Sequence, residues 1–516
     1  MPPETPATIY DKVAYPSYAH PQTHPDQLAT KALLYGMSPA PIERCRVLEL
    51  GCFNGTNLAS IALGFPQCEC IGIDLSATAI AQGQEMMQAI GVKNVSLRVG
   101  SIMDIGADLG KFDYIIAHGL YSWVPESVRQ KIMSICQTHL TPHGVACISF
   151  NAKPGGYIKQ MFRDMMLFHT KNMTSPQERV HHGISLLKFV TEAQTTNESY
   201  RRLFHDEFAK QILRNPYGTF HDDLADVNEI FSLQEFCEHA QSNGLQYLCD
   251  GDYLLTDEHN LAEPVRLGAR QLGKNRIAHE QYLDYLSGRS FRQTYVCRAD
   301  VPLKFEFLLA MLERLHVCSL VRPVSTQPKL SSEASEKFIG KTKAQVEVSM
   351  PLAKSALVVL SEITPHAMPL KELLIQARAR IGSAPSSTFT DPQTTQALDI
   401  LLRLYSPGII TLHLSPPVFA KGVSKQPTAS PLARWLLKLS DTLPNLLHES
   451  VPLKNPSGRH LLSLLDGTRD RAALLGEMRA FVSTQPQNSA DGDVDGNLTN
   501  ALNFFADNGL LMPDGF

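Results

Sequence analysis

The first third of the chain alternates short apolar runs with longer segments of helical periodicity. Runs of consecutive apolar residues predict buried strands, whereas apolar residues three or four positions apart predict helices. Strands that alternate with helices form a parallel sheet with helices on both faces. The pattern therefore predicts an α/β domain with a Rossmann-like sheet. Its strands are expected at 46–50, 70–74, 95–99, 112–117 and 145–150, with helices at 56–64, 76–90 and 128–140.

The alternation stops near residue 152, where several helical segments follow one another. Apolar runs at 245–248 and 291–299 then resume the strand pattern. We expect these two late strands to complete the first sheet. The segment of about 152–230 is then a helical insertion within one domain.

The last third has a different pattern. Residues 323–350 are rich in Ser, Lys, Pro and Gln, which is typical of a linker or a long exposed loop. Helical periodicity dominates afterwards, and a Pro-Gly turn leads into a short apolar strand at 409–413, an order that resembles a winged helix. Acidic and basic residues are equally frequent from residue 330 onward, so a protein-interaction or structural module is favoured over a DNA-binding one.

These patterns predict four parts of the chain. They are an N-terminal arm at 1–36, a ligand-binding domain at 37–300, a helix and linker at 301–350, and a mainly helical, winged-helix-like region at 351–516. Within the second part, residues of about 218–300 form a distinct later segment.

Composition narrows the class of protein. The chain has 516 residues, 43% of them hydrophobic, and a net charge of −4, so no overall basic field favours nucleic acid. No apolar run is long enough to cross a membrane, and the N-terminus does not have the pattern of a signal peptide. The ten cysteines are scattered without a common zinc spacing. We therefore expect a cytoplasmic protein with reduced thiols and no metal.

A glycine turn at 51–55 joins the first strand to the first helix. Backbone N–H groups at such a helix start bind negative groups, and Asp74 at the end of strand two is positioned for ribose hydroxyls. A dinucleotide site would carry a second glycine where Phe53 stands. Glu49, two residues before Gly51, instead suits a ligand with an amino-acid tail. S-adenosylmethionine (SAM) is such a ligand, because its ammonium and carboxylate need a carboxylate and N–H groups side by side.

The chain resembles class I SAM-dependent methyltransferases. More narrowly, it is similar to bacterial methyltransferases with a methyltransferase regulatory domain, a group that includes protein-lysine methyltransferases of outer-surface proteins. The segments that carry the resemblance are YDKVAYPSYAHPQTHPDQLAT (10–30), VLELGCFNGTN (47–57), IGIDLS (71–76), FDYIIAHGLYSWVP (112–125), ISFNAKPGG (148–156), FCEHAQSNGLQYL (236–248), FRQTYVCR (291–298) and GRHLLSLLDGTRDRAAL (458–474).

The resemblance and the strand ends together imply the roles of the cofactor residues, because an open α/β sheet binds ligands at its carboxyl edge. The methionine part of SAM is expected against Glu49, Gly51, Cys52 and Gly55. The ribose and adenine are expected against Asp74, Leu75, Ser101 and Ile102, and the sulfonium against His118 and Gly119.

Four further residues are candidates for the acceptor side. Tyr121 and Trp123 follow strand four, and their rings either hold a cationic amine and shield the sulfonium or form a hydrophobic plug. Asn151 ends strand five and either bonds the acceptor or serves the turn. Tyr15 lies in the aromatic, His-bearing arm, which is either a lid that closes the pocket or an ordinary packed arm.

The residues and the resemblance leave three functions open. The first is methyl transfer from SAM to a protein lysine, leaving S-adenosylhomocysteine; the second is transfer to a small molecule; the third is SAM binding without turnover. Phe53 favours the third if its ring fills the methionine site. The family resemblance also implies that the helical insertion is a contact in a homodimer.

Overall fold

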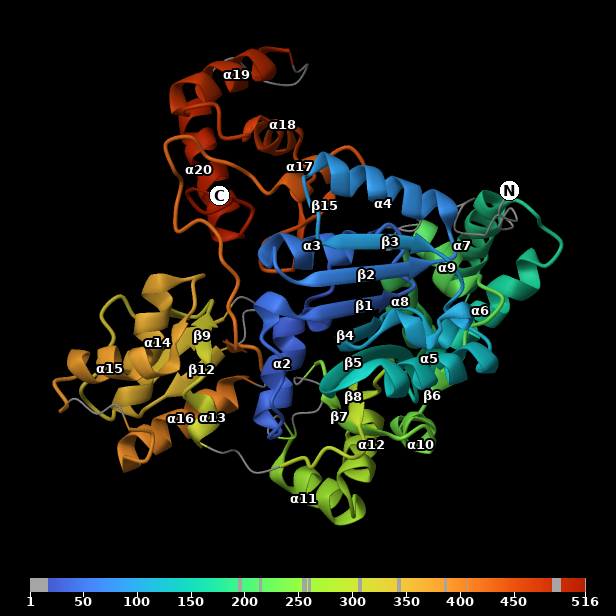
Figure 1. Ribbon diagram of the computed structural model, residues 1–516, viewed down its shortest axis with the longest axis horizontal. Coiled ribbons are helices and arrows are strands. Elements are labelled where there is room, and N and C mark those ends of the chain that lie inside the picture. The colour runs from blue at the N-terminus through green and yellow to red at the C-terminus, as the bar shows by residue number, and fades with distance from the viewer. Residues whose placement is uncertain are drawn as a thin grey trace.

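The computed structural model describes most of the chain and consists of one large sheet with helical bodies around it (Figure 1). The described residues are 17–193, 197–212, 216–252, 258, 261–304, 309–340, 345–384, 388–405, 407–484 and 493–515.

The large sheet has the order β3-β2-β1-β4-β5-β8-β7, with the two-residue strand β6 also paired with β5. Strands β1 to β5 are parallel, which confirms the predicted Rossmann-like arrangement. The strands are β1 (Arg46–Leu50), β2 (Glu69–Asp74), β3 (Val95–Val99), β4 (Phe112–Ala117), β5 (Leu140–Ala152), β6 (Ile230–Phe231), β7 (Leu245–Asp250) and β8 (Phe291–Arg298).

The two late strands complete this sheet, as the sequence predicts. β8 runs antiparallel to β5, with Ile148 opposite Thr294, and β7 pairs antiparallel with β8. Residues far downstream in the sequence therefore extend the same sheet. The helices before β8 are α10 (Leu233–Ser242), α11 (Glu263–Leu272) and α12 (Arg276–Ser287).

Alternate residues of each strand face opposite layers of helices, because side chains of a strand alternate between faces. Val47 packs with α2 (Pro25–Leu34), α3 (Thr56–Gly64) and α4 (Ala77–Ala89), whereas Leu48 packs with α5 (Glu126–His139) and α10. Both sides of the central strands are thus fully buried.

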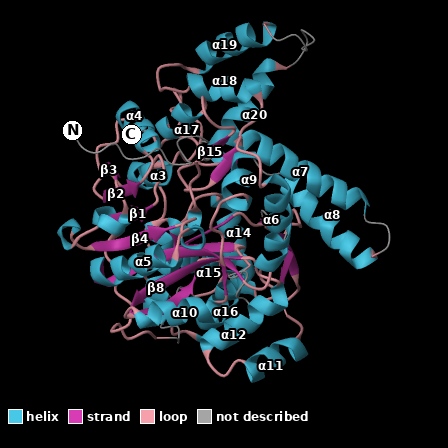
Figure 2. Ribbon diagram, turned by 90° about the vertical axis from the view of Figure 1, so that its right-hand side faces the viewer, coloured by secondary structure: helices cyan, strands magenta, loops and turns pink. Residues whose placement is uncertain are grey.

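The insertion between β5 and β6 folds around its own apolar cluster. Phe162, Met166, Leu187 and Phe204 form its core. Figure 2 shows these helices on one side of the molecule, beside the carboxyl edge of the sheet. They are α6 (Gly156–Thr170), α7 (Pro176–Ala193), α8 (Glu198–Ile212) and α9 (Pro216–Asp223).

The segment at 323–350, expected to be a linker or a long exposed loop, is an exposed loop over most of 324–335, but its later part is ordered and packed. It contains two antiparallel strands, and the buried Phe338 packs into the core of the next body. The buried Lys354 ammonium also donates to the main-chain carbonyls of Lys329, Ser332 and Ala334, at 2.6–2.7 Å, which orders the polar loop. The elements of this body are α13 (Leu309–Leu312), β9 (His316–Ser319), β10 (Arg322–Pro323), β11 (Glu336–Ile339), β12 (Gln345–Val348), α14 (Pro351–Ile363), β13 (Met368–Pro369), α15 (Leu370–Arg380), α16 (Pro392–Tyr405) and β14 (Ile410–His413).

The expected single region at 351–516 divides between two apolar cores. Residues up to Leu412 belong to the body just described. Residues from Ala420 onward share the core of the large sheet, on the side of α3 and α4. This last body contains α17 (Pro431–Leu436), β15 (Thr442–Pro444), β16 (Ser450–Pro452), α18 (Pro456–Leu464), α19 (Arg471–Ser483) and α20 (Val494–Asp507).

Among the described helices, none combines the length and the apolar character needed to cross a membrane.

Candidate active site

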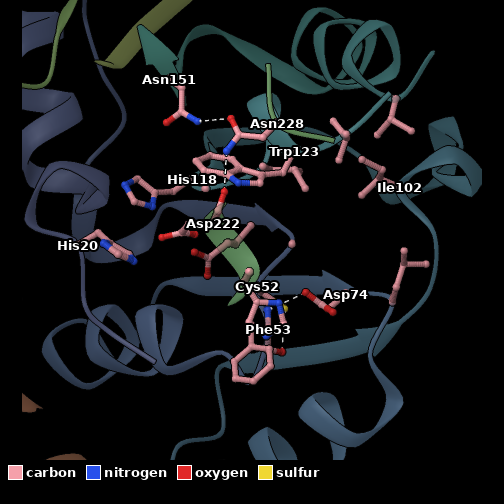
Figure 3. A pocket seen from close by; sticks show the side chains of 18 of the residues that line it. His20, Cys52, Phe53, Asp74, Ile102, His118, Trp123, Asn151, Asp222 and Asn228 are labelled. Carbon is pink, nitrogen blue, oxygen red and sulfur yellow. Dashed lines mark hydrogen bonds between the residues drawn. The ribbon is translucent and has the colours of Figure 1, made fainter. Parts of the chain in front are cut away.

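A cavity of about 720 Å³ opens at the carboxyl ends of β1, β2 and β4 (Figure 3). Parallel strands of an open sheet place their ligands at this edge. Three separate parts of the chain form its walls: the strand ends, the N-terminal arm from Ser17, and the insertion, which supplies residues of α6 and α9.

The glycine turn has the backbone that its sequence predicts. Gly51 (φ 72°) and Gly55 (φ 71°) both adopt positive φ, which glycine tolerates best. Gly51 and Cys52 line the cavity, but Gly55 does not. Gly55 instead precedes α3, and a Cβ there would lie 2.7 Å from a Leu97 methyl group. The structure thus gives Gly55 a packing role at this turn, and its expected contact with the cofactor remains a prediction.

Phe53 also has a positive φ, of 49°, and its N–H donates to Asp74 Oδ2 at 2.8 Å. Its ring borders the cavity, but Figure 3 shows it apart from the groups around His118 and Trp123. The ring therefore leaves the central part of the cavity open.

Glu49 lines the cavity and is almost fully buried. Its Oε1 accepts a hydrogen bond from Asn57 at 2.8 Å, whereas Oε2 has no partner among the described residues. Burial raises the pKa of this carboxyl to about 8, and the charge of Asp74 acts in the same direction. A buried oxygen without a partner is costly, so this site favours a cationic ligand group.

The predicted adenosine residues also meet in the cavity. Asp74 ends β2, and its two oxygens accept N–H groups of Phe53 and Ser76. Leu75 is 49% exposed and borders the same space as Ile102. The Ser101 hydroxyl accepts the Met103 N–H at 3.1 Å, which turns the following residues toward the cavity.

The end of β4 brings two neutral imidazoles together. The His118 ring stacks on the His20 ring with centroids 3.9 Å apart. Burial lowers the pKa of His20 to about 4 and that of His118 well below its usual value, so both rings are neutral at pH 7. Gly119 donates its N–H to the Ser149 hydroxyl at 2.7 Å, which fixes this loop.

The two aromatic candidates after β4 separate. Trp123 lines the cavity. Tyr121 does not: it is 2% exposed, contacts Phe231 and Phe236, and its hydroxyl lies 2.6 Å from His239 Nδ1. The expectation that Tyr121 contacts the reacting groups is therefore wrong. Tyr121 packs against α10, as expected from the alternative in which its ring forms a hydrophobic plug.

Asn151 lines the cavity at the end of β5. Its N–H donates to the Ser122 hydroxyl at 2.8 Å, and its side-chain amide donates to Asn228 Oδ1 at 2.9 Å. The side chain therefore has a fixed orientation at the wall of the cavity (Figure 3).

The N-terminal arm forms a further wall. Ser17 donates to Asn54 at 3.0 Å, and the His20 N–H donates to Asn57 Oδ1 at 3.1 Å. Ser17, Tyr18 and His20 line the cavity. Tyr15 lies outside the described residues, so its predicted role remains a prediction.

The contribution of the insertion to the cavity is not apparent from the sequence. Its segment looks like ordinary amphipathic helices, and no local motif marks the residues that face the cavity. Only the fold brings them to the carboxyl edge of the sheet. The polar and charged residues among them are Lys159, Gln160, His221, Asp222, Asp223 and Asn228.

The cavity as a whole fits SAM. The unpartnered Glu49 oxygen suits the ammonium, Asp74 suits the ribose, and the apolar side chains of Leu75 and Ile102 suit a flat base. The neutral ring of His118 lies where the sulfonium is expected. Among the described residues, no group of side chains has the arrangement of a metal site.

Family comparisons agree with this geometry. Residues 42–206 match a family described as "Methyltransferase domain", and residues 215–298 match "Predicted methyltransferase regulatory domain". Residues 425–510 match "PKMT, C-terminal winged helix domain".

Individual relatives extend the match to most of the chain. An uncharacterised protein of Rickettsia prowazekii (strain Madrid E) is 29% identical over 475 residues, which is 90% of this chain and 84% of that protein. A second protein of the same organism is 34% identical over 242 residues, 46% of this chain and 96% of that protein. The structure of PKMT2 from Rickettsia typhi superposes with a TM-score of 0.85 and 25% identity, covering 96% of this chain and 99% of that one. The same protein in complex with AdoHcy gives a TM-score of 0.86.

The fold and the cavity define a SAM-dependent methyltransferase. The chain belongs to the family of class I methyltransferases that carry a methyltransferase regulatory domain and a PKMT winged-helix domain.

Proposed function

We propose that this methyltransferase acts on the side-chain amine of a protein lysine. The observation that carries the proposal is the surplus of acidic groups around the cavity: among the described residues, the carboxylates of Asp74, Asp222 and Asp223 and the buried Glu49 carboxyl line it, against one lining ammonium, that of Lys159. Such a lining attracts a cationic acceptor and repels a carboxylate acceptor. The likeness to PKMT2 over nearly the whole chain supports the same acceptor class.

The proposed mechanism depends on alignment and on exclusion of water. SAM, when bound, supplies the methyl group on its sulfonium. Glu49 and the glycine turn hold the amino-acid end, and Asp74 holds the ribose. Trp123 supplies apolar surface beside the reacting centre, and the neutral His118 ring adds no charge there. Methyl transfer is an in-line displacement, which is accelerated mainly by holding the reacting atoms in line and by excluding water.

The test is methyl transfer by the full-length protein to a mixture of bacterial surface proteins, with SAM labelled with tritium in its methyl group. After acid hydrolysis, the label should be in ε-N-methylated lysine. The matched control is Glu49→Gln, which should give little incorporation because it removes the charge that binds the ammonium. Label in a small-molecule fraction, or in another amino acid, would overturn the proposal.

A further inference from the structure

The carboxylates around the cavity form two groups. Glu49 and Asp74 lie on β1 and β2 and are accounted for by the cofactor. Asp222 and Asp223 end α9, in the insertion, and also line the cavity. The second group belongs to the insertion and not to the strand ends where the cofactor is expected.

Asp222 belongs to the same wall as the two stacked histidines. Figure 3 shows it between His20 and His118 on one side and Asn228 on the other. Burial raises the pKa of Tyr18, and the Asp222 charge raises it further, so this carboxylate acts on the N-terminal arm as well. The neighbouring imidazoles are neutral, so the negative charge beside them comes from the insertion, where Asp222 and Asp223 both line the cavity.

Asn228 is the centre of a hydrogen-bond network that links α6, α9 and β5. Its Oδ1 accepts from Asn151 at 2.9 Å and from Gln160 at 3.0 Å. Its own amide donates to the Asp222 main-chain carbonyl at 2.6 Å, and its carbonyl accepts from Gln160 at 2.8 Å. Since the Asn151 NH₂ group is directed to Asn228, the Asn151 Oδ1 atom is the side-chain acceptor left for a ligand.

We propose that the insertion builds the acceptor subsite: Asp222 binds the acceptor as a primary ammonium on an aliphatic chain, and Asn228 is a positioning residue that aims Asn151 Oδ1 at that nitrogen. This inference rests on the proposed function and names how its substrate is recognised. Before transfer the ammonium releases one proton to water, which exposes the nitrogen lone pair. The N–CH₃ bond then forms as the S–CH₃ bond breaks, and the electron pair of that bond remains on sulfur.

The role of Asp222 is tested with N-α-acetyl-lysine N-methylamide and its norleucine analogue, which lacks the charge. Binding of each to the full-length protein saturated with S-adenosylhomocysteine is measured by calorimetry. Asp222→Asn should weaken lysine-probe binding at least tenfold and change S-adenosylhomocysteine affinity less than twofold. The control is Asp226→Asn, an exposed residue outside the cavity that should bind both ligands like the unaltered protein. Equal binding of the two probes, or no binding of the lysine probe by the unaltered protein, would overturn the assignment.

The role of Asn228 is tested by a double-mutant cycle. Asn228→Ala should lower kcat at least tenfold with the SAM KM nearly unchanged, and Asn228→Asp, which keeps an acceptor for Asn151, should restore part of the loss. If Asn228 acts through Asn151, the double variant should lose little more kcat than Asn151→Ala alone. Fully additive losses would show that Asn228 does not act through Asn151 and would overturn its positioning role.

The two proposals fail in different ways. If methylated lysine is absent from the protein substrates but Asp222→Asn still abolishes binding of the lysine probe, the protein-lysine function fails and the ammonium subsite stands. If lysine is methylated and Asp222→Asn has no effect, the function stands and the acceptor subsite fails.

Discussion

At the scale of single residues, Glu49 has the most specific chemistry in the cavity. It is a carboxyl group with one oxygen bonded to Asn57 and the other buried without a partner among the described residues. Its raised pKa means that the carboxyl of the cofactor-free protein holds a proton near neutral pH. A bound ammonium favours the carboxylate, so cofactor binding must expel this proton.

SAM affinity should therefore depend on pH in a defined direction. Below the pKa of about 8 in the cofactor-free protein, binding costs the removal of a proton, so affinity should rise by about tenfold from pH 6 to pH 7 and less steeply toward pH 8. Calorimetry in buffers of different ionisation enthalpy should show the release of nearly one proton at pH 7. Glu49→Gln should bind at least tenfold more weakly at pH 8 and lose the proton release. A pH-independent affinity in the unaltered protein would contradict the assignment of the ammonium to Glu49.

Tyr121 and Trp123 are two residues apart, and of the two only Trp123 lines the cavity. Substitutions at the two positions should therefore have different effects. Tyr121→Phe should leave kcat and the SAM KM within about threefold, and lower the free energy of unfolding by about 1 kcal/mol through the lost contact with His239. Trp123→Phe should lower kcat/KM for the acceptor at least tenfold while stability changes little. Chemical denaturation measures the stability of the two variants, and steady-state kinetics measures their activity. A larger loss of kcat/KM in Tyr121→Phe than in Trp123→Phe would contradict the assignment of Trp123 to the cavity and Tyr121 to the core.

At the scale of elements, the strands of the sheet were predictable, whereas the two strands within 323–350 and the fixed position of the polar loop before them were not. Apolar runs reveal the strands because both faces of the sheet are buried. The loop carries few large apolar residues, and its order depends on one buried ammonium. Periodicity does not reveal that the Lys354 side chain is inside, because lysine is rarely buried.

Lys354→Met tests this explanation. The variant keeps most of the side-chain volume but removes the donors for three carbonyls. The free energy of unfolding of this body should fall by about 2–4 kcal/mol, because three main-chain carbonyls lose charge-assisted hydrogen bonds to a buried donor. Limited proteolysis should cut between residues 324 and 336 much faster than in the unaltered protein. Exposed Lys371→Met is the control, and equal cutting rates in the two variants would show that the ammonium does not order the loop.

The candidate site likewise contains residues that a local sequence pattern predicts and residues that only the packing of distant segments brings there. Glu49, Asp74 and His118 could be predicted because each lies near the end of a strand or begins the turn after it, and parallel strand ends meet at one edge. The orientation of Tyr121 depends on α10, about 110 positions downstream, so no local pattern decides between cavity and core. Asp222 and Asn228 reach the cavity through the packing of a separate helical cluster, which periodicity within those helices does not specify.

At the scale of the whole molecule, distant parts of the chain converge on the N-terminal arm. Asp26 on α2 accepts the Ser415 N–H at 2.7 Å and contacts His413 at 2.7 Å, which ties the arm to β14. From the other side, the hairpin of β15 and β16 reaches the arm, where Ser450 donates to the Ala19 carbonyl at 3.3 Å. The arm that walls the cavity is thus held by both C-terminal bodies.

His448 lies in the turn of the hairpin formed by β15 and β16. It is buried, has a φ of 58°, lies 2.9 Å from the Ser60 hydroxyl through Nδ1, and packs with its ring 5.0 Å from that of His24. His448→Asn keeps a side chain that tolerates positive φ but removes the ring. Because the arm and α3 lose this contact, SAM affinity should fall about three- to tenfold although His448 does not line the cavity.

Fluorescence titration of the full-length variant with S-adenosylhomocysteine measures the effect. The control is His460→Asn in the same C-terminal body, where the ring stacks on Phe481 and lies outside the cavity. That variant should bind the cofactor normally even if its melting temperature falls. If both histidine variants weaken cofactor binding equally, the effect is a general loss of stability. If neither variant weakens binding, the arm is held without the hairpin. In that case the last C-terminal body has no part in forming the cofactor site.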